Sequence, residues 1–270
     1  MLMYYSNMKH FIYDLAKTYP QIVIPIKEGI SKTEEYKDIA LRGKESKYPI
    51  TFSLSELDSF ETVKTKMGDV NIITMYKRED FIHMVRCLGN KCEPVIVPDS
   101  TGAMAIFGLN NWDKVRQGLD DYKDSIIVLS SGNYSNVSCD DVKKVSAGEI
   151  NLTIDEWTNK SIIIRKYHEI THFVMRKEYP NDIKAIRDEL IADMIGLKAA
   201  FGYYDQRLAK LFLGIENKEY RKGGRLENYC DNYLEEIPSI LKMIDNLSKI
   251  SNNHQNYEDA LNNVELYMRV

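Results

Sequence analysis

The spacing of apolar residues divides the chain into two parts that meet near residue 145. Before this point, short runs rich in β-branched residues alternate with segments whose apolar residues recur at helical spacing, which is typical of an α/β layer. After residue 150 the apolar pattern is almost entirely helical. We therefore expect an α+β fold, with an α/β portion over residues 1–145 and a mostly helical portion over residues 146–270.

The same patterns and their bounding turns predict the individual elements. In the first portion we expect strands over residues 21–26, 70–76, 94–97 and 125–129, and helices over residues 8–17, 55–66, 78–88 and 112–122. In the second portion we expect helices from the capping box 153–156 to about residue 177, from a cap at 181 or 182 to Gly202, and over 206–213, 227–234, 237–247 and 257–268, with Pro238 marking a turn. Residues 130–136, rich in Ser, Asn and Gly, are expected to form a flexible loop.

Composition limits the classes of partner. The chain has 270 residues, of which 44% are hydrophobic and 10% aromatic, so it can bury a core. A net charge of −4 argues against general binding of nucleic acid or anionic membranes, because both require a basic surface. No apolar run is long enough to span a membrane, and residues 1–10 lack an export signal. We therefore expect a cytoplasmic protein whose cysteines stay reduced.

The most informative segment is His168-Glu169-x-x-His172 in the first long helix. Two imidazoles four residues apart on a helix point the same way and can bind one zinc ion. The glutamate beside the first histidine is placed to act on water that the metal activates. Hydrolysis is therefore the first functional hypothesis.

The next helix offers the carboxylate that two histidines still require. Glu189 and Asp193 lie on one face of it, and a turn at residues 179–181 would let the helix return antiparallel. Glu189 would be the third metal ligand, whereas Asp193 would accept a hydrogen bond from the other ring nitrogen of a liganding histidine. The helix also carries small residues that would permit close packing. These are Ala192, Gly196, Ala199 and Ala200.

Together the two motifs resemble the gluzincin branch of the zincin metallopeptidases, in which His-Glu-x-x-His is followed by Glu-x-x-x-Asp on the next active-site helix. Residues 189–196 are most similar to the second motif of the membrane-bound CAAX prenyl protease and heat-shock protease zincins, and residues 168–172 are equally close to thermolysin-like enzymes. The resemblance covers roughly residues 155–202. The membrane relatives have spanning helices and the thermolysin-like enzymes are secreted, so the sequence departs from both patterns.

The resemblance implies a zincin-like fold in which one zinc ion per chain lies between the α/β and helical portions. It implies the ligands His168, His172 and Glu189, with Glu169 as general base and Asp193 supporting a ligand. The expected activity is hydrolysis of an amide bond in a peptide or protein substrate. The alternatives are a zinc-binding regulatory or interaction protein with little hydrolytic activity, and a metallohydrolase of a non-peptide substrate. Glu169 favours an enzyme, because a structural zinc needs no base.

Two features of the substrate cleft remain open in the sequence. In gluzincins a Tyr, His or Arg beyond the third ligand usually stabilises the tetrahedral intermediate, and several residues here are candidates. They are Tyr203, Tyr204, Tyr220, Arg221, Arg225, Tyr229 and His254. The Gly-hinged basic loop 220–225 is either a substrate-facing segment or a solvated connection. In zincins an edge strand before the zinc helix pairs with extended substrate, and the predicted strand 125–129 is the candidate here.

Overall fold

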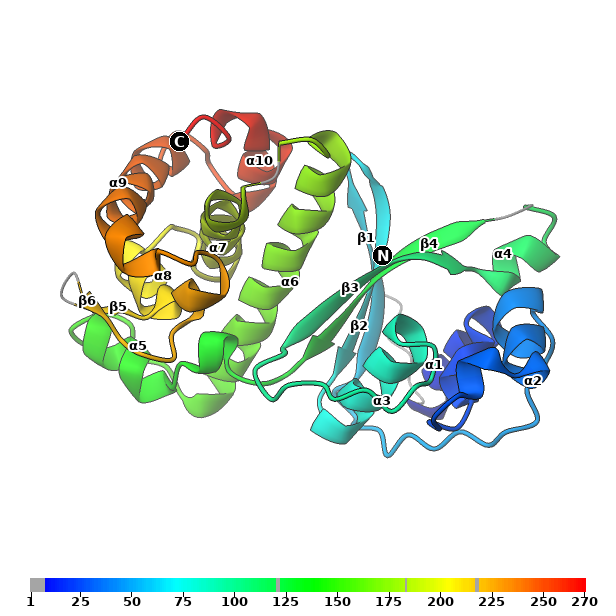
Figure 1. Cartoon of the computed structure of the whole chain (residues 1–270). Helices are drawn as coiled ribbons and strands as arrows, with labels where there is room; N and C mark the ends of the chain where they lie inside the picture. The colour runs from blue at the N-terminus through cyan, green and yellow to red at the C-terminus, as the bar shows by residue number, and fades with distance from the viewer. Residues whose placement is uncertain (1–7, 120–121, 183, 217–218) are drawn as a thin grey trace. The chain divides into compact units, whose positions relative to one another are not determined.

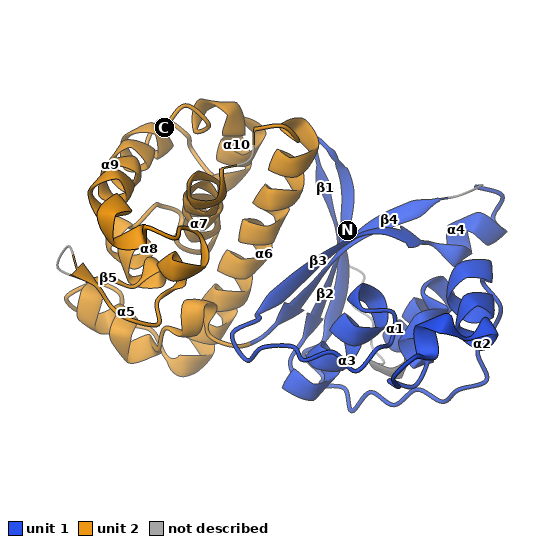
Figure 2. Cartoon of the chain, viewed as in Figure 1, with its two compact units in different colours: residues 1–131 blue, residues 132–270 orange. Residues whose placement is uncertain are grey.

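The computed structural model describes residues 8–119, 122–182, 184–216 and 219–270 (Figure 1). It forms two compact units, Met1–Ser131 and Gly132–Val270 (Figure 2). The α+β class is confirmed, but the units divide earlier than residue 145, because helix α5 (Cys139–Val145) contacts helix α8 (Gln206–Leu213) of the second unit. Residues 1–7, part of the segment in which we found no export signal, lie outside the described residues.

A four-stranded mixed sheet, in the order β1-β2-β4-β3, forms the centre of the first unit. Strand β1 (Ser59–Thr65) pairs antiparallel with β2 (Gly68–Met75), β2 pairs parallel with β4 (Lys123–Ser130), and β4 pairs antiparallel with β3 (Ala103–Asn110). The predicted strands 70–76 and 125–129 are therefore confirmed. The expectation that strand 125–129 is an edge strand is wrong, since β4 is hydrogen-bonded on both sides and has no free edge for a substrate.

Three predictions for the first unit are wrong for identifiable reasons. Residues 55–66 do not form a helix, because residues 59–65 pair with β2 along the whole strand and the hairpin turns at Gly68, whose φ is 105°. Residues 21–26 contain a 3₁₀-helix, η1 (Pro20–Val23), in which all four residues are buried. Residues 94–97 form no strand, because Pro94 and Pro98 cannot donate ladder hydrogen bonds and Ile96 is 90% exposed. Strand β3 was not predicted.

Helices and shorter turns complete the first unit. They are α1 (Met8–Thr18), η2 (Ile30–Lys32), α2 (Glu34–Tyr36), η3 (Lys37–Leu41), α3 (Arg78–Gly89) and α4 (Trp112–Arg116). The predicted helices 8–17 and 78–88 are thus confirmed. Helix α4 is shorter than predicted, because Gly118 has a positive φ of 93°, and residues 120–121 lie outside the description. Helix α3 packs on β2, β3 and β4 and buries Phe81 and Met84 in the core.

The second unit is mostly helical, as predicted. It contains η4 (Tyr134–Asn136), α5, α6 (Ile154–Glu178), α7 (Ala185–Phe201), α8, the hairpin β5 (Ile215–Glu216) and β6 (Glu219–Tyr220), η5 (Arg225–Asn228), α9 (Tyr233–Ser251), α10 (Tyr257–Asn262) and η6 (Val264–Leu266). No described helix has the length and apolar character that crossing a membrane requires.

The ends of α6 and α7 test the predicted caps. Thr153 and Glu156 form the expected capping box at the start of α6, and Gly202, with φ 82°, ends α7. The predicted cap of α7 at residue 181 or 182 is wrong. The helix begins at Ala185, and the side chain of Asp188 accepts a hydrogen bond from the backbone of Lys184 instead.

Two further helix predictions change near the C-terminus. Residues 227–234 do not form one helix, because η5 ends at Asn228 and α9 starts at Tyr233. Helix α9 runs through Pro238, which therefore marks no turn, since a buried apolar face continues along the helix on both sides of it. The predicted helix 257–268 breaks at Asn263, whose side-chain amide donates to the carbonyl of Asp259 and competes with helical pairing.

Helices α6 and α7 approach each other closely in antiparallel register. Lys160 donates to the carbonyl of Ala200, and a Cβ atom added to Gly196 would lie 2.6 Å from the carbonyl oxygen of Ile164. Later residues of α6 therefore lie beside earlier residues of α7. The predicted role of Gly196 in close packing is confirmed.

We predict that Gly196→Ala lowers the free energy of unfolding by about 1–3 kcal/mol, because backbone atoms of α6 cannot move aside as a side chain can. This loss should appear in urea denaturation although alanine is the better helix former. Gly89→Ala is the matched control, because Gly89 also lies in a helix and its added Cβ would approach side chains rather than backbone, the flexible Met104 at 2.5 Å and Ile106 at 3.6 Å. Unchanged stability of the Gly196 variant would contradict the close contact.

Candidate metal centre

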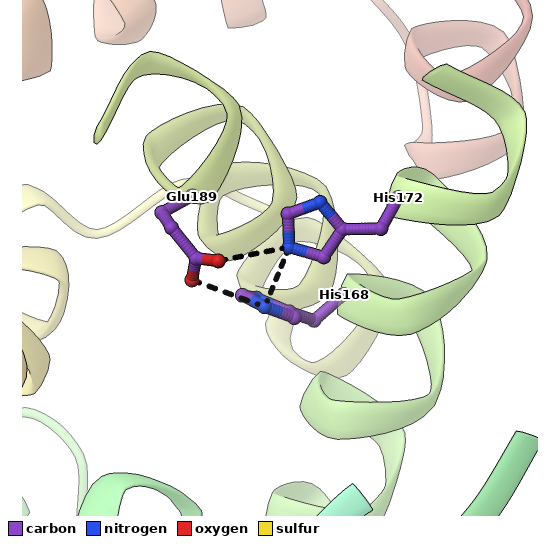
Figure 3. Close-up of side chains that lie close together, drawn as sticks. All are labelled: His168, His172 and Glu189. Carbon is purple, nitrogen blue, oxygen red and sulfur yellow. Dashed lines mark hydrogen bonds and ion pairs between the residues drawn. The ribbon is translucent and has the colours of Figure 1, made fainter. Parts of the chain in front are cut away.

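Helices α6 and α7 bring together the three predicted metal ligands (Figure 3). The Nε2 atoms of His168 and His172 lie 3.1 Å apart. The Glu189 carboxylate lies 3.4 Å from His168 Nε2 and 3.2 Å from His172 Nε2. Ligand atoms bound tetrahedrally to zinc at about 2.0–2.1 Å are separated by roughly 3.3–3.4 Å. The three donor separations, 3.1, 3.2 and 3.4 Å, are therefore close to those of zinc ligands.

The ligand cluster belongs to the second unit. All three side chains come from α6 and α7, so two consecutive helices of this unit supply the cluster. Within the described residues, no other His, Cys, Asp or Glu joins this cluster.

Asp193 orients the first histidine as predicted. Its side chain is fully buried, and its Oδ1 lies 2.9 Å from Nδ1 of His168. The opposite ring nitrogen, Nε2, therefore faces Glu189 and His172. Burial alone would raise the pKa of Asp193, but the positive charge of Arg225 and the hydrogen bonds from His168 and Tyr134 lower it overall.

Tyr134 completes this support and was missed in the sequence. Its hydroxyl donates to Asp193 Oδ1 at 2.5 Å and lies 2.8 Å from His168 Nδ1. The side chain is 4% exposed, and burial raises its pKa well above the usual value. In the sequence Tyr134 is an aromatic residue within a polar segment, a pattern that surface loops also show.

The segment around Tyr134 is held from α6 rather than being a flexible loop. Arg165 donates to the carbonyls of Gly132 and Asn133 at 2.8 and 3.2 Å. Trp157 donates through its indole nitrogen to the carbonyl of Val137 at 2.8 Å. These bonds span the positive-φ turn that follows Tyr134. The prediction of a flexible loop over residues 130–136 is therefore wrong.

Arg225 bridges the two buried carboxylates. Its Nη2 lies 3.2 Å from Glu189 Oε2 and 3.1 Å from Asp193 Oδ1. Its Nη1 donates to the Tyr134 hydroxyl at 2.8 Å. The guanidinium compensates buried negative charge and fixes the tyrosine, so the basic loop contributes directly to the site.

The other proposed stabilisers divide into two groups. Tyr229 lies within electrostatic range of Glu189, and the Arg225 guanidinium lies over its ring. Tyr204 is buried within electrostatic range of Asp193, and its hydroxyl has no hydrogen-bond partner among the described residues. Four more candidates make no hydrogen bond, ion pair or ring contact with the ligands in the described part of the chain. They are Tyr203, Tyr220, Arg221 and His254. Tyr203 is 46% exposed, while Tyr220 bonds to Gly224, Arg221 to Glu216 and His254 to Asp259.

Glu169 is half-buried on α6, next to His168 in the chain. No hydrogen bond or ion pair holds its carboxylate within the residues that the structure describes. The other nearby carboxylates, in contrast, are fixed by His168, His172 or Arg225. Glu169 is therefore free to act as an acceptor.

The protonation of His168 follows from its surroundings. Burial lowers its pKa, but the carboxylates of Glu189 and Asp193 outweigh this effect and raise the pKa to about 10. Burial raises the pKa of Glu189, whereas the two histidines lower it more strongly. In the absence of metal the proton on His168 occupies the place of a cation, so a metal and a proton compete for the same donors.

Comparison with known proteins gives one match. A family model described as "Family of unknown function (DUF7005)" matches residues 4–121 and 118–268. No curated protein and no solved structure matches the chain.

We predict that Tyr134→Phe weakens zinc binding about tenfold or more, because the groups that orient a liganding histidine contribute to metal affinity. Competition with a chromophoric chelator measures the dissociation constant. Tyr167→Phe is the control, since Tyr167 precedes His168 on α6 and its hydroxyl pairs with that of Tyr257, 3.0 Å away. Equal affinities of the two variants would show that the Tyr134 hydroxyl does not support the ligand.

We also predict that Arg225→Gln lowers the unfolding free energy of the metal-free protein by about 3–5 kcal/mol, because it leaves buried carboxylates without their cation. Arg221→Gln is a control in the same loop. Its ion pair with Glu216 is about half exposed and should contribute no more than about 1 kcal/mol. Urea denaturation of both variants at one pH makes the comparison. Similar losses would contradict a bridging role for Arg225.

Proposed function

The chain belongs to this family of unknown function, and we propose from the geometry of its metal centre that it is a zinc-dependent peptidase of gluzincin type. The observation that carries the proposal is the set of three donor atoms at separations of 3.1, 3.2 and 3.4 Å, together with Glu169, which follows His168 in the chain and has no hydrogen bond or ion pair among the described residues. A structural zinc site would normally have a fourth protein ligand. In the described part of the chain the cluster has three donors and the Glu169 carboxylate has no partner, which favours a catalytic site.

Each residue has a defined part in the proposed reaction. His168, His172 and Glu189 would hold the zinc ion. When bound, zinc would lower the pKa of water to about 7 and polarise the scissile carbonyl. Glu169 accepts the proton of the attacking water and passes it to the leaving amine, first as general base and then as general acid.

The remaining groups prepare the donors for this reaction. Asp193 accepts a hydrogen bond from Nδ1 of His168, so that the lone pair of Nε2 points toward Glu189 and His172. Tyr134 and Arg225 fix Asp193 in turn. They are positioning residues, because their hydrogen bonds are made to the groups that support the ligands.

We predict that wild-type protein and Glu169→Gln each bind about one zinc ion per chain, and that only the wild type cleaves peptides. Loss of a general base typically reduces kcat by roughly 10²–10⁴-fold. Elemental analysis and a peptide library provide the two measurements. Glu236→Gln, at an exposed position on α9, serves as the activity control, and His168→Ala should lose the metal.

Three outcomes would redirect the proposal. Wild-type protein that binds no zinc would refute the metal centre. A zinc-loaded protein without hydrolytic activity would instead favour a regulatory or interaction protein. Cleavage of esters or other non-peptide amides with no cleavage of peptides would identify a metallohydrolase of another substrate class.

A further inference from the structure

A small cavity opens directly beside two of the metal ligands. It has a volume of about 150 Å³, and its walls include His172, Met175 and Arg176 of α6 and Asp188 and Glu189 of α7. Pockets that enclose a whole drug-sized ligand are larger, about 300–1,000 Å³, whereas a cavity of about 150 Å³ accommodates benzene. The cavity therefore fits one side chain or chain end of a larger substrate.

Most charges around the cavity are already compensated. Arg187 donates to Asp188 at 3.1 Å and to Asp182 at 3.3 Å, so it pairs with both aspartates. Glu189 is held by the histidines and by Arg225. Arg176, in contrast, has no hydrogen bond or ion pair within the described residues. It is exposed and is the one charged side chain of the cavity wall without such a partner there.

The position of Arg176 on α6 relates it to the chemistry. It lies one helical turn after His172 and two turns after Glu169, so the three residues share one stripe of the helix. Two turns correspond to about 10 Å along the helix axis. The long arginine side chain covers part of this distance. A substrate group that reaches Arg176 therefore lies close to the bond that Glu169 would act on.

We propose that Arg176 binds a carboxylate of the substrate while the adjoining cavity takes the neighbouring side chain. The substrate class would be peptides that carry a carboxylate beside the cleaved bond, either the C-terminal carboxylate or an Asp or Glu side chain. Arginine suits this role because its planar guanidinium makes charge-assisted, bidentate hydrogen bonds to carboxylates. The inference rests on the proposed peptidase function and specifies its substrate.

Three peptides of equal length and otherwise identical sequence show whether Arg176 binds a C-terminal carboxylate or an acidic side chain. One has a free C-terminus, one is amidated, and one is amidated and carries an internal aspartate. Their binding to zinc-loaded Glu169→Gln protein is measured by fluorescence polarisation, which requires no cleavage. In parallel, KM and kcat are measured with wild-type protein.

We expect at least one carboxylate peptide to bind about tenfold more tightly than the neutral peptide, as hydrogen bonds to charged groups allow. Arg176→Gln, introduced into both proteins, should abolish this preference and raise KM with little change in kcat. Lys184→Gln is the matched control, because it removes a nearby positive charge that does not line the cavity. The preference should also decline with added salt, since Arg176 is exposed.

The outcomes distinguish this inference from the proposed function. Zinc-dependent cleavage without any carboxylate preference would overturn the role of Arg176 and leave the peptidase proposal intact. Arg176-dependent binding of a carboxylate peptide without cleavage by the wild type would overturn the peptidase proposal alone. The inference also fails if none of the peptides binds, or if Lys184→Gln and Arg176→Gln have the same effect.

Discussion

The close contact between α6 and α7 at Gly196 is the constraint on which the cluster of His168, His172 and Glu189 depends. The absence of a Cβ lets α7 approach the carbonyl of Ile164 and fixes the register of the two helices. The same antiparallel register then places Asp193 beside His168 and Glu189 beside His172, one helical turn further along. A slip of one turn would move Glu189 by about 5.4 Å and remove it from the histidines. The ligand geometry is thus a consequence of backbone packing.

The packing also creates an electrostatic problem, which residues from distant segments resolve. Two carboxylates lie close together in a buried site, where uncompensated charge is strongly unfavourable. Arg225 approaches from the basic loop and contacts both, while Tyr134 approaches from the turn before α5 and contacts Asp193. Glu169 takes no part in this network within the described residues. The groups that hold the site together are therefore separate from the group proposed to move a proton.

The sequence predicts the local parts of this arrangement better than the long-range parts. The two helices, the capping box and the pair of histidines on one helix face follow from residue spacing, because their contacts repeat every three or four positions. Tyr134 was missed since its hydrogen bond to Asp193 joins residues 59 positions apart. Strand β1 was mistaken for a helix because its pairing with β2, rather than its own pattern, determines its conformation. Arg225 was one of several open candidates until the fold of its loop brought it to the carboxylates.

The charges of the cluster explain why a proton and a metal ion would compete for His168. Without metal, the negative charges of Glu189 and Asp193 are balanced by Arg225 and by the proton on His168, whose pKa of about 10 keeps the ring charged at neutral pH. A zinc ion that replaces this proton would add one further positive charge to the cluster. A metal ion and this proton would therefore exclude each other at the same ring nitrogen.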